Sequence, residues 1–228
     1  MSDAKRLAAE AAAELVEDGM RLGLGTGSTV AFLLPALARR GLRDLRCIAT
    51  SDATAVRAAE VGIPVERFDA ADALDELDLT IDGADEVAPD GWLVKGGGGA
   101  HVRERIAADA SARFVVIVSE DKMVPVLRRA VPLELLPYGL PATLRHLPGA
   151  RLREGAPASP DGGVIADLHV DPSDPGPLAA RLDAVPGVVG HGLFPPAPDL
   201  RVLVGREDGV ELLTLSPGDR AAPARRLA

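Results

Sequence analysis

Short apolar segments with the character of strands alternate with helical segments along the first half of the chain, and few folds accept that order. The segment 113–119 (RFVVIVS) is rich in β-branched residues, which is typical of a strand buried on both faces. Neighbouring strands are expected at 21–25, 45–50, 77–81 and 92–94, and helices at 3–18, 30–40, 52–61 and 101–110. We therefore predict an α/β fold, a mostly parallel Rossmann-like sheet with helices on both faces.

The pattern changes after about residue 127, where the expected order becomes strand, helix, strand, strand, helix, strand. That order is the ferredoxin-like split βαβ unit and predicts a smaller α+β domain. Its strands are expected at 132–138, 150–153, 164–170 and 188–194, its helices at 141–147 and 177–185, and a Pro/Gly/Ser-rich loop at 155–163.

Two apolar segments near the end of the chain, 200–205 and 210–215, flank Glu207-Asp208-Gly209 and predict a hairpin. We place this hairpin back on the parallel sheet, after a linker at 195–198. The predicted organisation is a larger α/β domain over 1–127 and 200–228, which carries the catalytic blocks described below, and a small α+β domain over 128–199. The tail from Ser216 is expected to fray.

Charge and composition exclude several classes of protein. The 228 residues carry a net charge of −9, which argues against nucleic acid as a partner because no broad cationic face is available. No apolar run reaches the ~18 residues that a membrane-spanning helix needs, and the first residues lack the apolar stretch of a signal peptide. Cys47 is the single cysteine, so no intrachain disulfide can form. We expect a cytoplasmic protein without a membrane partner.

A glycine-rich turn, Gly25-Thr26-Gly27-Ser28-Thr29, joins the first expected strand to the next helix. Free N–H groups at a helix N-terminus, together with hydroxyl donors, suit a small phosphate. The glycine spacing does not match the G-x-G-x-x-G of dinucleotide-binding proteins, and no lysine follows as in a P-loop. From this block alone, a phosphate site and a tight turn with an ordinary helix cap are equally compatible.

An acidic segment, Asp82-Gly83-Ala84-Asp85-Glu86, follows the strand expected at 77–81. Ligand sites of open α/β sheets lie at the carboxyl ends of strands. Three carboxylates in five residues repel one another unless a cation or a protonated partner lies among them. A metal site is one interpretation, although the calcium-loop pattern is absent and the four histidines show no ligand spacing. An exposed acidic turn is the other.

Lys95 precedes four consecutive glycines, Gly96–Gly99, and an expected helix that contains Glu104. Consecutive glycines cost stability, so their use here predicts backbone N–H groups around a developing oxyanion. A glutamate whose pKa is tuned by its surroundings is a competent base for a proton α to a carbonyl. The alternatives are a flexible linker and an ordinary surface glutamate paired with arginine.

Lysine is rare in this chain, where only Lys5, Lys95 and Lys122 stand among 25 basic residues. Since nearly all the basic residues are arginine, a lysine predicts a position that needs a compact ammonium group. Codon bias is the alternative explanation. The functional interpretation is stronger for Lys95 and Lys122 than for Lys5. Lys122 follows the strand expected at 113–119, where it could contact a phosphate as a point charge or remain a solvated loop residue.

Taken together, these blocks resemble the type A ribose-5-phosphate isomerases in order and spacing over essentially the whole chain. The blocks are Gly25–Thr29, Ser51–Thr54, Asp82–Glu86, Lys95–Gly98 with Glu104, and Asp121-Lys122, while 132–134, 184–189 and 192–194 resemble the small domain of the family. Two departures stand out. Gly99 extends the glycine run where the family usually has alanine, and His101 occupies a position where an apolar residue is expected.

The resemblance implies an enzyme that interconverts D-ribose 5-phosphate and D-ribulose 5-phosphate through an enediolate, without a metal or other cofactor. It implies that Glu104 is the proton acceptor and that Asp82, Asp85 and Lys95 are further catalytic residues. The residues implied to bind substrate are Thr26, Gly27, Ser28, Thr29, Asp82, Gly83, Ala84, Asp85, Lys95, Gly96, Gly97, Gly98 and Lys122. It also implies a homodimer or a homotetramer.

Other functions on such a scaffold remain open at this point. An amino-sugar-phosphate deaminase would need a ring-opening histidine, which is missing from the expected neighbourhood. A coenzyme A transferase would use Glu104 as a nucleophile toward an acyl group. A sugar-phosphate sensor without activity would be expected to accompany a DNA-binding helix pair or a basic patch, and neither is present in the sequence. The glycine spacing disfavours a nicotinamide enzyme.

Overall fold

The computed structural model describes residues 2–227 except 71, 199 and 216–224. In this part of the chain the largest sheet has eight strands, in the order β15-β14-β13-β7-β4-β1-β2-β3. The strands from β3 to β13 run parallel, and β14 and β15 are antiparallel additions at one edge. The bounds are β1 (Arg21–Leu24), β2 (Arg46–Ala49), β3 (Val65–Glu66), β4 (Leu79–Asp82), β7 (Phe114–Ser119), β13 (Leu200–Arg206), β14 (Gly209–Leu215) and β15 (Arg225–Leu227).

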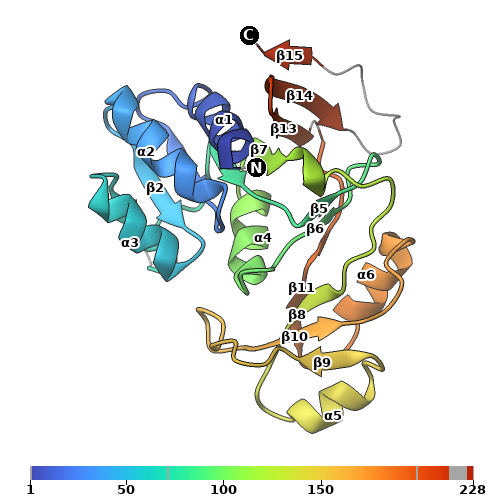
Figure 1. Ribbon diagram of the computed structural model, residues 1–228. Coiled ribbons are helices and arrows are strands. Elements are labelled where there is room, and N and C mark those ends of the chain that lie inside the picture. Colours follow the sequence, from blue (N-terminus) through green and yellow to red (C-terminus); the bar gives the residue numbers. More distant parts are fainter. Residues whose placement is uncertain (1, 71, 199, 216–224, 228) are drawn as a thin grey trace.

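Helices pack on both faces of this sheet, as predicted (Figure 1). The helices are α1 (Ser2–Ala13), α2 (Val30–Arg40), α3 (Asp52–Glu60) and α4 (His101–Asp109). Alternate side chains of β7 divide between two cores because successive residues of a strand face opposite ways. Val115 and Ile117 pack with α1 and α2, whereas Val116 and Val118 pack with Phe194 on the other face.

The strand order reverses beside β1, and this reversal positions the site. From β1 the chain proceeds through α2 to β2 on one side, and β4 later pairs with β1 on the other side. A crevice forms where neighbouring connections leave in opposite directions from the carboxyl ends of the strands. The glycine-rich turn after β1 and Asp82 at the end of β4 both lie there.

The second half of the chain forms the antiparallel sheet predicted for a ferredoxin-like unit (Figure 1). Its order is β11-β8-β10-β9, in which the first and third strands of the motif form the inner pair and the second and fourth lie at the edges. The elements are β8 (Val131–Leu135), α5 (Leu140–Arg145), β9 (Ala150–Leu152), β10 (Val164–Leu168), α6 (Pro175–Asp183) and β11 (Val188–His191). The division into two domains at 127/128 and 199/200 stays a prediction.

Several local features differ from expectation. The segment expected as one strand at 188–194 divides at Gly192 into β11 and β12 (Leu193–Phe194), and β12 joins β6 (Leu93–Val94) and β5 (Glu86–Val87) in a third sheet. β3, β5 and the 3-10 turn η1 (Glu120–Lys122) were not expected. Residues 225–227 pair with β14 instead of fraying. The rest of the tail, 216–224 and 228, lies outside the described part of the chain. The hairpin of β13 and β14 returns to β7 as predicted.

Candidate active site

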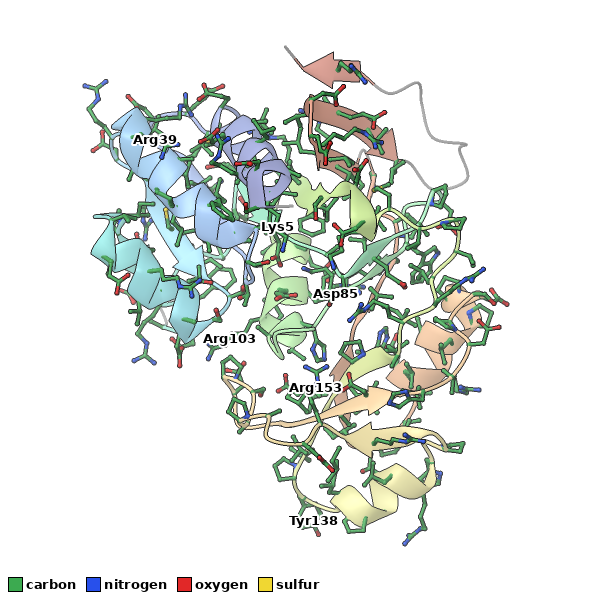
Figure 2. All side chains as sticks on the ribbon, in the orientation of Figure 1. Lys5, Arg39, Asp85, Arg103, Tyr138 and Arg153 are labelled. Atoms are coloured by element: carbon green, nitrogen blue, oxygen red, sulfur yellow. The ribbon has the colours of Figure 1, made fainter. Side chains whose placement is uncertain are left out.

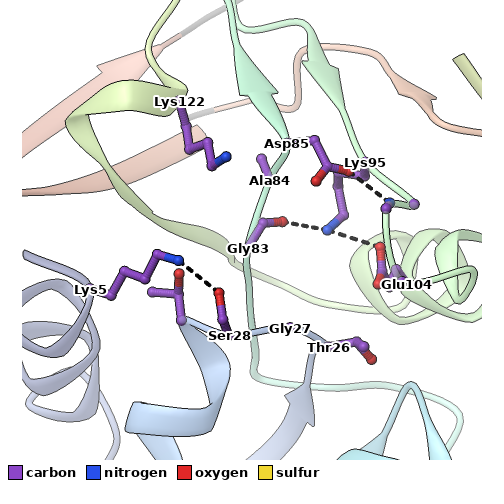
Figure 3. Close-up of a pocket in the computed structure, with 14 residues that line it drawn as sticks. Lys5, Thr26, Gly27, Ser28, Gly83, Ala84, Asp85, Lys95, Glu104 and Lys122 are labelled. Atoms are coloured by element: carbon purple, nitrogen blue, oxygen red, sulfur yellow. Dashed lines mark hydrogen bonds and ion pairs between the residues drawn. The ribbon is translucent and has the colours of Figure 1, made fainter. Parts of the chain in front are cut away.

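The residues predicted to bind substrate, apart from Asp82, line one pocket of about 150 Å³ in the crevice beside β1, and Figure 2 labels Asp85 and Lys5 of its lining. The turn after β1 forms one wall, and the acidic segment and the glycine run form another (Figure 3). The lining residues are Lys5, Thr26, Gly27, Ser28, Thr29, Gly83, Ala84, Asp85, Lys95, Gly96, Gly97, Gly98, Glu104 and Lys122. Every predicted site residue except Asp82 is among them, and Asp82 lies directly behind Lys95.

A carboxylate, an ammonium and a second carboxylate form the floor of the pocket. The Lys95 Nζ lies 2.7 Å from Asp82 Oδ2 and 3.0 Å from Glu104 Oε2, and it also donates to the Gly83 carbonyl. The exposed fractions of Asp82, Lys95 and Glu104 are 0%, 2% and 3%. The contact with Glu104 has ion-pair distance without hydrogen-bond geometry, so Glu104 Oε2 is a buried acceptor without a hydrogen-bond donor among the described residues.

Burial and neighbouring charges shift the pKa values of this cluster. Burial raises the pKa of Glu104 to about 8, the Asp82 charge adds to the rise, and Lys95 opposes it. For Lys95, burial lowers the pKa, but the charges of Asp82 and Glu104 more than offset it and leave the pKa above its ordinary value. The site therefore holds a cation next to a carboxyl group that exchanges protons near neutral pH.

The three carboxylates of the acidic segment have separate partners. Asp82 Oδ1 accepts hydrogen bonds from the backbone N–H groups of Thr26 (2.9 Å) and Gly83 (2.7 Å). Asp85 Oδ2 accepts one from the Gly97 N–H at 2.8 Å. Glu86 lies in β5, and its Oε2 accepts hydrogen bonds from the backbone N–H groups of Arg128 and Arg129. Mutual repulsion is thus relieved without a metal, and the described residues contain no group of three or more His, Cys, Asp or Glu that could hold one.

Glycine is required at Gly25 and Gly97 for a steric reason. A Cβ at Gly25 would lie 2.0 Å from Asp82 Oδ1, and a Cβ at Gly97 would lie 2.7 Å from Asp85 Oδ1. The backbone of each glycine therefore approaches a carboxylate more closely than any side chain allows.

The turn after β1 presents donors at the N-terminus of α2. Thr29 is the N-cap residue, and its hydroxyl makes no capping hydrogen bond, unlike Ser51 before α3, which accepts from the Thr54 N–H. Lys5 reaches across from α1 and donates to Ser28 Oγ at 2.9 Å, and Lys122 extends toward the same region from η1 (Figure 3). Helix N–H groups, hydroxyls and two ammonium groups are together the kinds of donor that suit a small dianion.

Of the three lysines, Lys5 had the weakest functional interpretation from sequence, although the rarity of lysine in this chain was a signal that applied to it as well. All three lysines of the chain line this one pocket. Lys5 lies in an ordinary amphipathic helix, far from the glycine and acidic blocks in the sequence, so only the tertiary packing of α1 beside α2 brings it to the site.

His101 is fully buried beside the glycine run, against Gly96. Burial lowers its pKa to about 4, and a contact with the Gly190 backbone opposes the shift without reaching hydrogen-bond geometry. The ring is therefore neutral at physiological pH and does not line the pocket.

Fold and site together define an α/β protein with an anion-binding turn opposite a buried acid–base pair at a strand-order reversal. Residues 46–209 match the family of ribose 5-phosphate isomerase A (phosphoriboisomerase A). Ribose-5-phosphate isomerase A of Caulobacter vibrioides is 46% identical over 222 residues, covering 91% of this chain and 96% of that protein. The chain belongs to the ribose 5-phosphate isomerase A family.

Solved structures agree over nearly the whole length. Ribose 5-phosphate isomerase A from Methanocaldococcus jannaschii has a TM-score of 0.85 and 34% identity, covering 93% of this chain and 98% of that one. A D-ribose-5-phosphate isomerase in complex with phospho-erythronic acid also has a TM-score of 0.85, with 33% identity, covering 92% of this chain and 97% of that one. Within the described residues, no helix combines the length and the apolar character needed to cross a lipid bilayer.

Proposed function

We propose that the protein is an aldose–ketose isomerase that interconverts D-ribose 5-phosphate and D-ribulose 5-phosphate, a step of the non-oxidative pentose phosphate pathway. The observation that carries the proposal is the buried Glu104 carboxyl at the floor of the pocket, 3.0 Å from the Lys95 ammonium. Relatives named ribose-5-phosphate isomerase A over nearly the whole chain support the same substrate.

The phosphate binds at the N-terminus of α2. Backbone N–H groups and the hydroxyls of Ser28 and Thr29 donate to its oxygens, and Lys5 and Lys122 balance its charge. This end of the pocket contains no carboxylate among its lining residues, whereas the other end contains Asp85 and Glu104. The substrate is thereby oriented with its phosphate toward α2 and its C1–C2 end toward Glu104.

Glu104 moves the proton between carbon atoms. In the open-chain aldose, the ionised carboxylate takes the proton from C2, the electron pair of that C–H bond forms the C1–C2 double bond, and the C1 carbonyl oxygen becomes an enediolate oxygen. The carboxyl then returns the proton to C1, while the hydroxyl proton of O2 passes to O1, which leaves the ketose carbonyl at C2. A raised pKa makes Glu104 a stronger base than an exposed glutamate.

The enediolate charge is stabilised by Lys95 and, within the glycine run, by the Gly98 N–H, because the Gly97 N–H already donates to Asp85. Donors already aimed at a developing oxyanion in a water-poor site contribute roughly 10²–10³ in rate each. Phospho-erythronic acid, bound in a relative, carries a carboxylate whose two coplanar oxygens share the shape and charge of an enediolate. That ligand supports a site of this kind here.

Asp82 and Asp85 have different roles in this proposal. Asp85 lines the pocket, where it can hold a substrate hydroxyl and assist ring opening. Asp82 is fully buried behind Lys95, so it holds the ammonium in its charged form and in place instead of touching the substrate.

Turnover of ribose 5-phosphate by the purified protein tests the function directly. The protein is treated with a chelator, mixed with ribose 5-phosphate and followed by the appearance of ketose. We expect sustained conversion with no added metal. Activity that disappears on chelation would contradict the metal-free mechanism, and a covalent Glu104 adduct formed with acyl-coenzyme A would favour a transferase instead.

We further propose that the enzyme works in the cytoplasm as a homodimer or homotetramer, as the family resemblance implies. The acidic composition and a single buried cysteine suit a reducing compartment. Light scattering coupled to size-exclusion chromatography tests the assembly, and a mass of one chain at micromolar concentration would contradict it.

A further inference from the structure

Arg153, labelled in Figure 2, directly follows β9 and connects the small antiparallel sheet to the glycine run. Its Nε and Nη2 donate to the two carboxylate oxygens of Asp167 on β10, at 2.8 and 2.5 Å. Its Nη1 donates to the carbonyl oxygens of Gly96 and Gly97, at 3.2 and 3.0 Å. One guanidinium therefore connects a rigid strand to two consecutive peptide groups beside the pocket.

These contacts determine which way the peptide groups of the run face. Gly96–Gly99 forms a β-turn closed by the hydrogen bond from the Gly99 N–H to the Gly96 carbonyl, at 3.0 Å. In a planar trans peptide the carbonyl and the following N–H point in opposite directions. Because Arg153 holds the carbonyls of Gly96 and Gly97, the N–H groups of Gly97 and Gly98 point away from it.

The pocket lies on that opposite side. The Gly97 N–H donates to Asp85 Oδ2, on the pocket wall, at 2.8 Å. Gly98 also lines the pocket, next to Thr26, and its N–H points away from Arg153, toward the pocket. A flipped peptide would instead present a carbonyl, the negative end of the group, to the enediolate.

We propose that Arg153 is a positioning residue for the reaction, which keeps the Gly97–Gly98 peptide turned so that the Gly98 N–H is directed at the oxygen charge of the enediolate, while the Gly97 N–H holds Asp85. The inference rests on the proposed function. A run of glycines has little intrinsic preference between peptide orientations, so an external contact has to select one. The planar fork of arginine can hold Asp167 and two carbonyls at once, whereas the single ammonium of lysine cannot.

The test compares kcat and KM for ribose 5-phosphate in wild type, Arg153→Lys and Arg153→Ala, with Arg151→Ala as the matched control. Arg151 lies two residues earlier, on β9, and is exposed. We expect both Arg153 variants to lose about 10–100-fold in kcat with KM within about threefold, because the Gly98 N–H acts on the transition state while the phosphate is bound elsewhere. Arg151→Ala should match wild type.

A second measurement separates positioning from a general structural role. Millimolar guanidinium chloride added to Arg153→Ala should recover at least about tenfold in kcat, and it should leave Arg153→Lys unchanged, since the ammonium still occupies the site. Circular dichroism confirms that each variant is folded, and if Arg153→Ala does not fold, the kcat and KM of Arg153→Lys decide alone.

The outcomes distinguish the two proposals. Wild type that does not convert ribose 5-phosphate would overturn the proposed function and this inference with it. Active wild type together with a fully active Arg153→Lys, or with variants that change KM alone, would overturn only the positioning role of Arg153.

Discussion

The carboxyl of Glu104 lies 3.0 Å from the ammonium of Lys95, and both groups are almost completely shielded from water. Two opposite charges so placed would ordinarily hold each other ionised. Here Asp82 already pairs with Lys95 at 2.7 Å, so the ammonium stays charged while Glu104 experiences burial and a second negative charge. This arrangement produces a base of raised pKa beside a permanent cation.

The first prediction concerns pH. Because proton abstraction needs ionised Glu104 and its pKa in the free protein is raised to about 8, kcat/KM should rise with pH and level off above about 8. Initial rates with ribose 5-phosphate between pH 5.5 and 9.5 measure this profile. A plateau that begins near pH 5 would mean that Glu104 has the pKa of an exposed carboxyl.

The second prediction concerns Lys5. Replacing it with methionine removes one charge-assisted contact to the phosphate, so KM should rise about tenfold with kcat little changed. Arg6→Met is the matched control, since Arg6 is the next residue of α1 and pairs with Glu10 at the protein surface. Equal KM values for the two variants would remove Lys5 from the phosphate site.

The third prediction concerns the close approach of Gly25 to Asp82. Gly25→Ala would place a Cβ 2.0 Å from Asp82 Oδ1, so the buried carboxylate must move and the protein should lose more than about 2 kcal/mol of stability. Gly176→Ala is the control, because its Cβ would meet only ordinary contacts, the nearest 3.8 Å away at Trp92. Thermal unfolding of both variants decides, and equal melting temperatures would contradict the steric account.

The fourth prediction concerns acid stability. The pKa of buried His101 falls from 6.5 to about 4, so below pH 6.5 the unfolded chain binds a proton that the folded protein does not. Stability is therefore lost as pH falls, by about 2 kcal/mol at pH 5 from this residue. His101→Leu should reduce the difference in melting temperature between pH 7.5 and pH 5 by several degrees. An unchanged difference would show that His101 is protonated in the folded state.

Much of the fold followed from periodicity, and the exceptions have tertiary causes. The helix expected over 3–18 ends at Ala13, because Arg40 of α2 donates to the carbonyls of Ala13 and Val16 and closes the last turn. Glu86 looked like part of an acidic turn, but backbone N–H groups more than forty residues away hold it inside β5. Partners so distant along the chain cannot be predicted from the local sequence.

The candidate site was more predictable than these details, because its chemistry is concentrated in short blocks. The turn after β1 and the acidic segment after β4 follow neighbouring parallel strands, whose carboxyl ends lie together, and the glycine run follows β6 in the third sheet. The sequence could not indicate that Asp82 would lie behind Lys95 or that Arg153 would hold the glycine carbonyls. Both depend on how side chains meet across separate sheets.

Glu104→Gln tests the central claim most directly, through the initial rate of ketose formation from saturating ribose 5-phosphate. The substitution keeps the shape of the side chain and removes the base. The loss of the negative charge should not lower the melting temperature. Because burial raises the pKa of Glu104, ionisation of this group destabilises the folded protein as pH rises from 4.5 toward 8. We predict a folded variant whose kcat falls by about 10³-fold or more. A kcat within tenfold of wild type would contradict the assignment of Glu104 as the base.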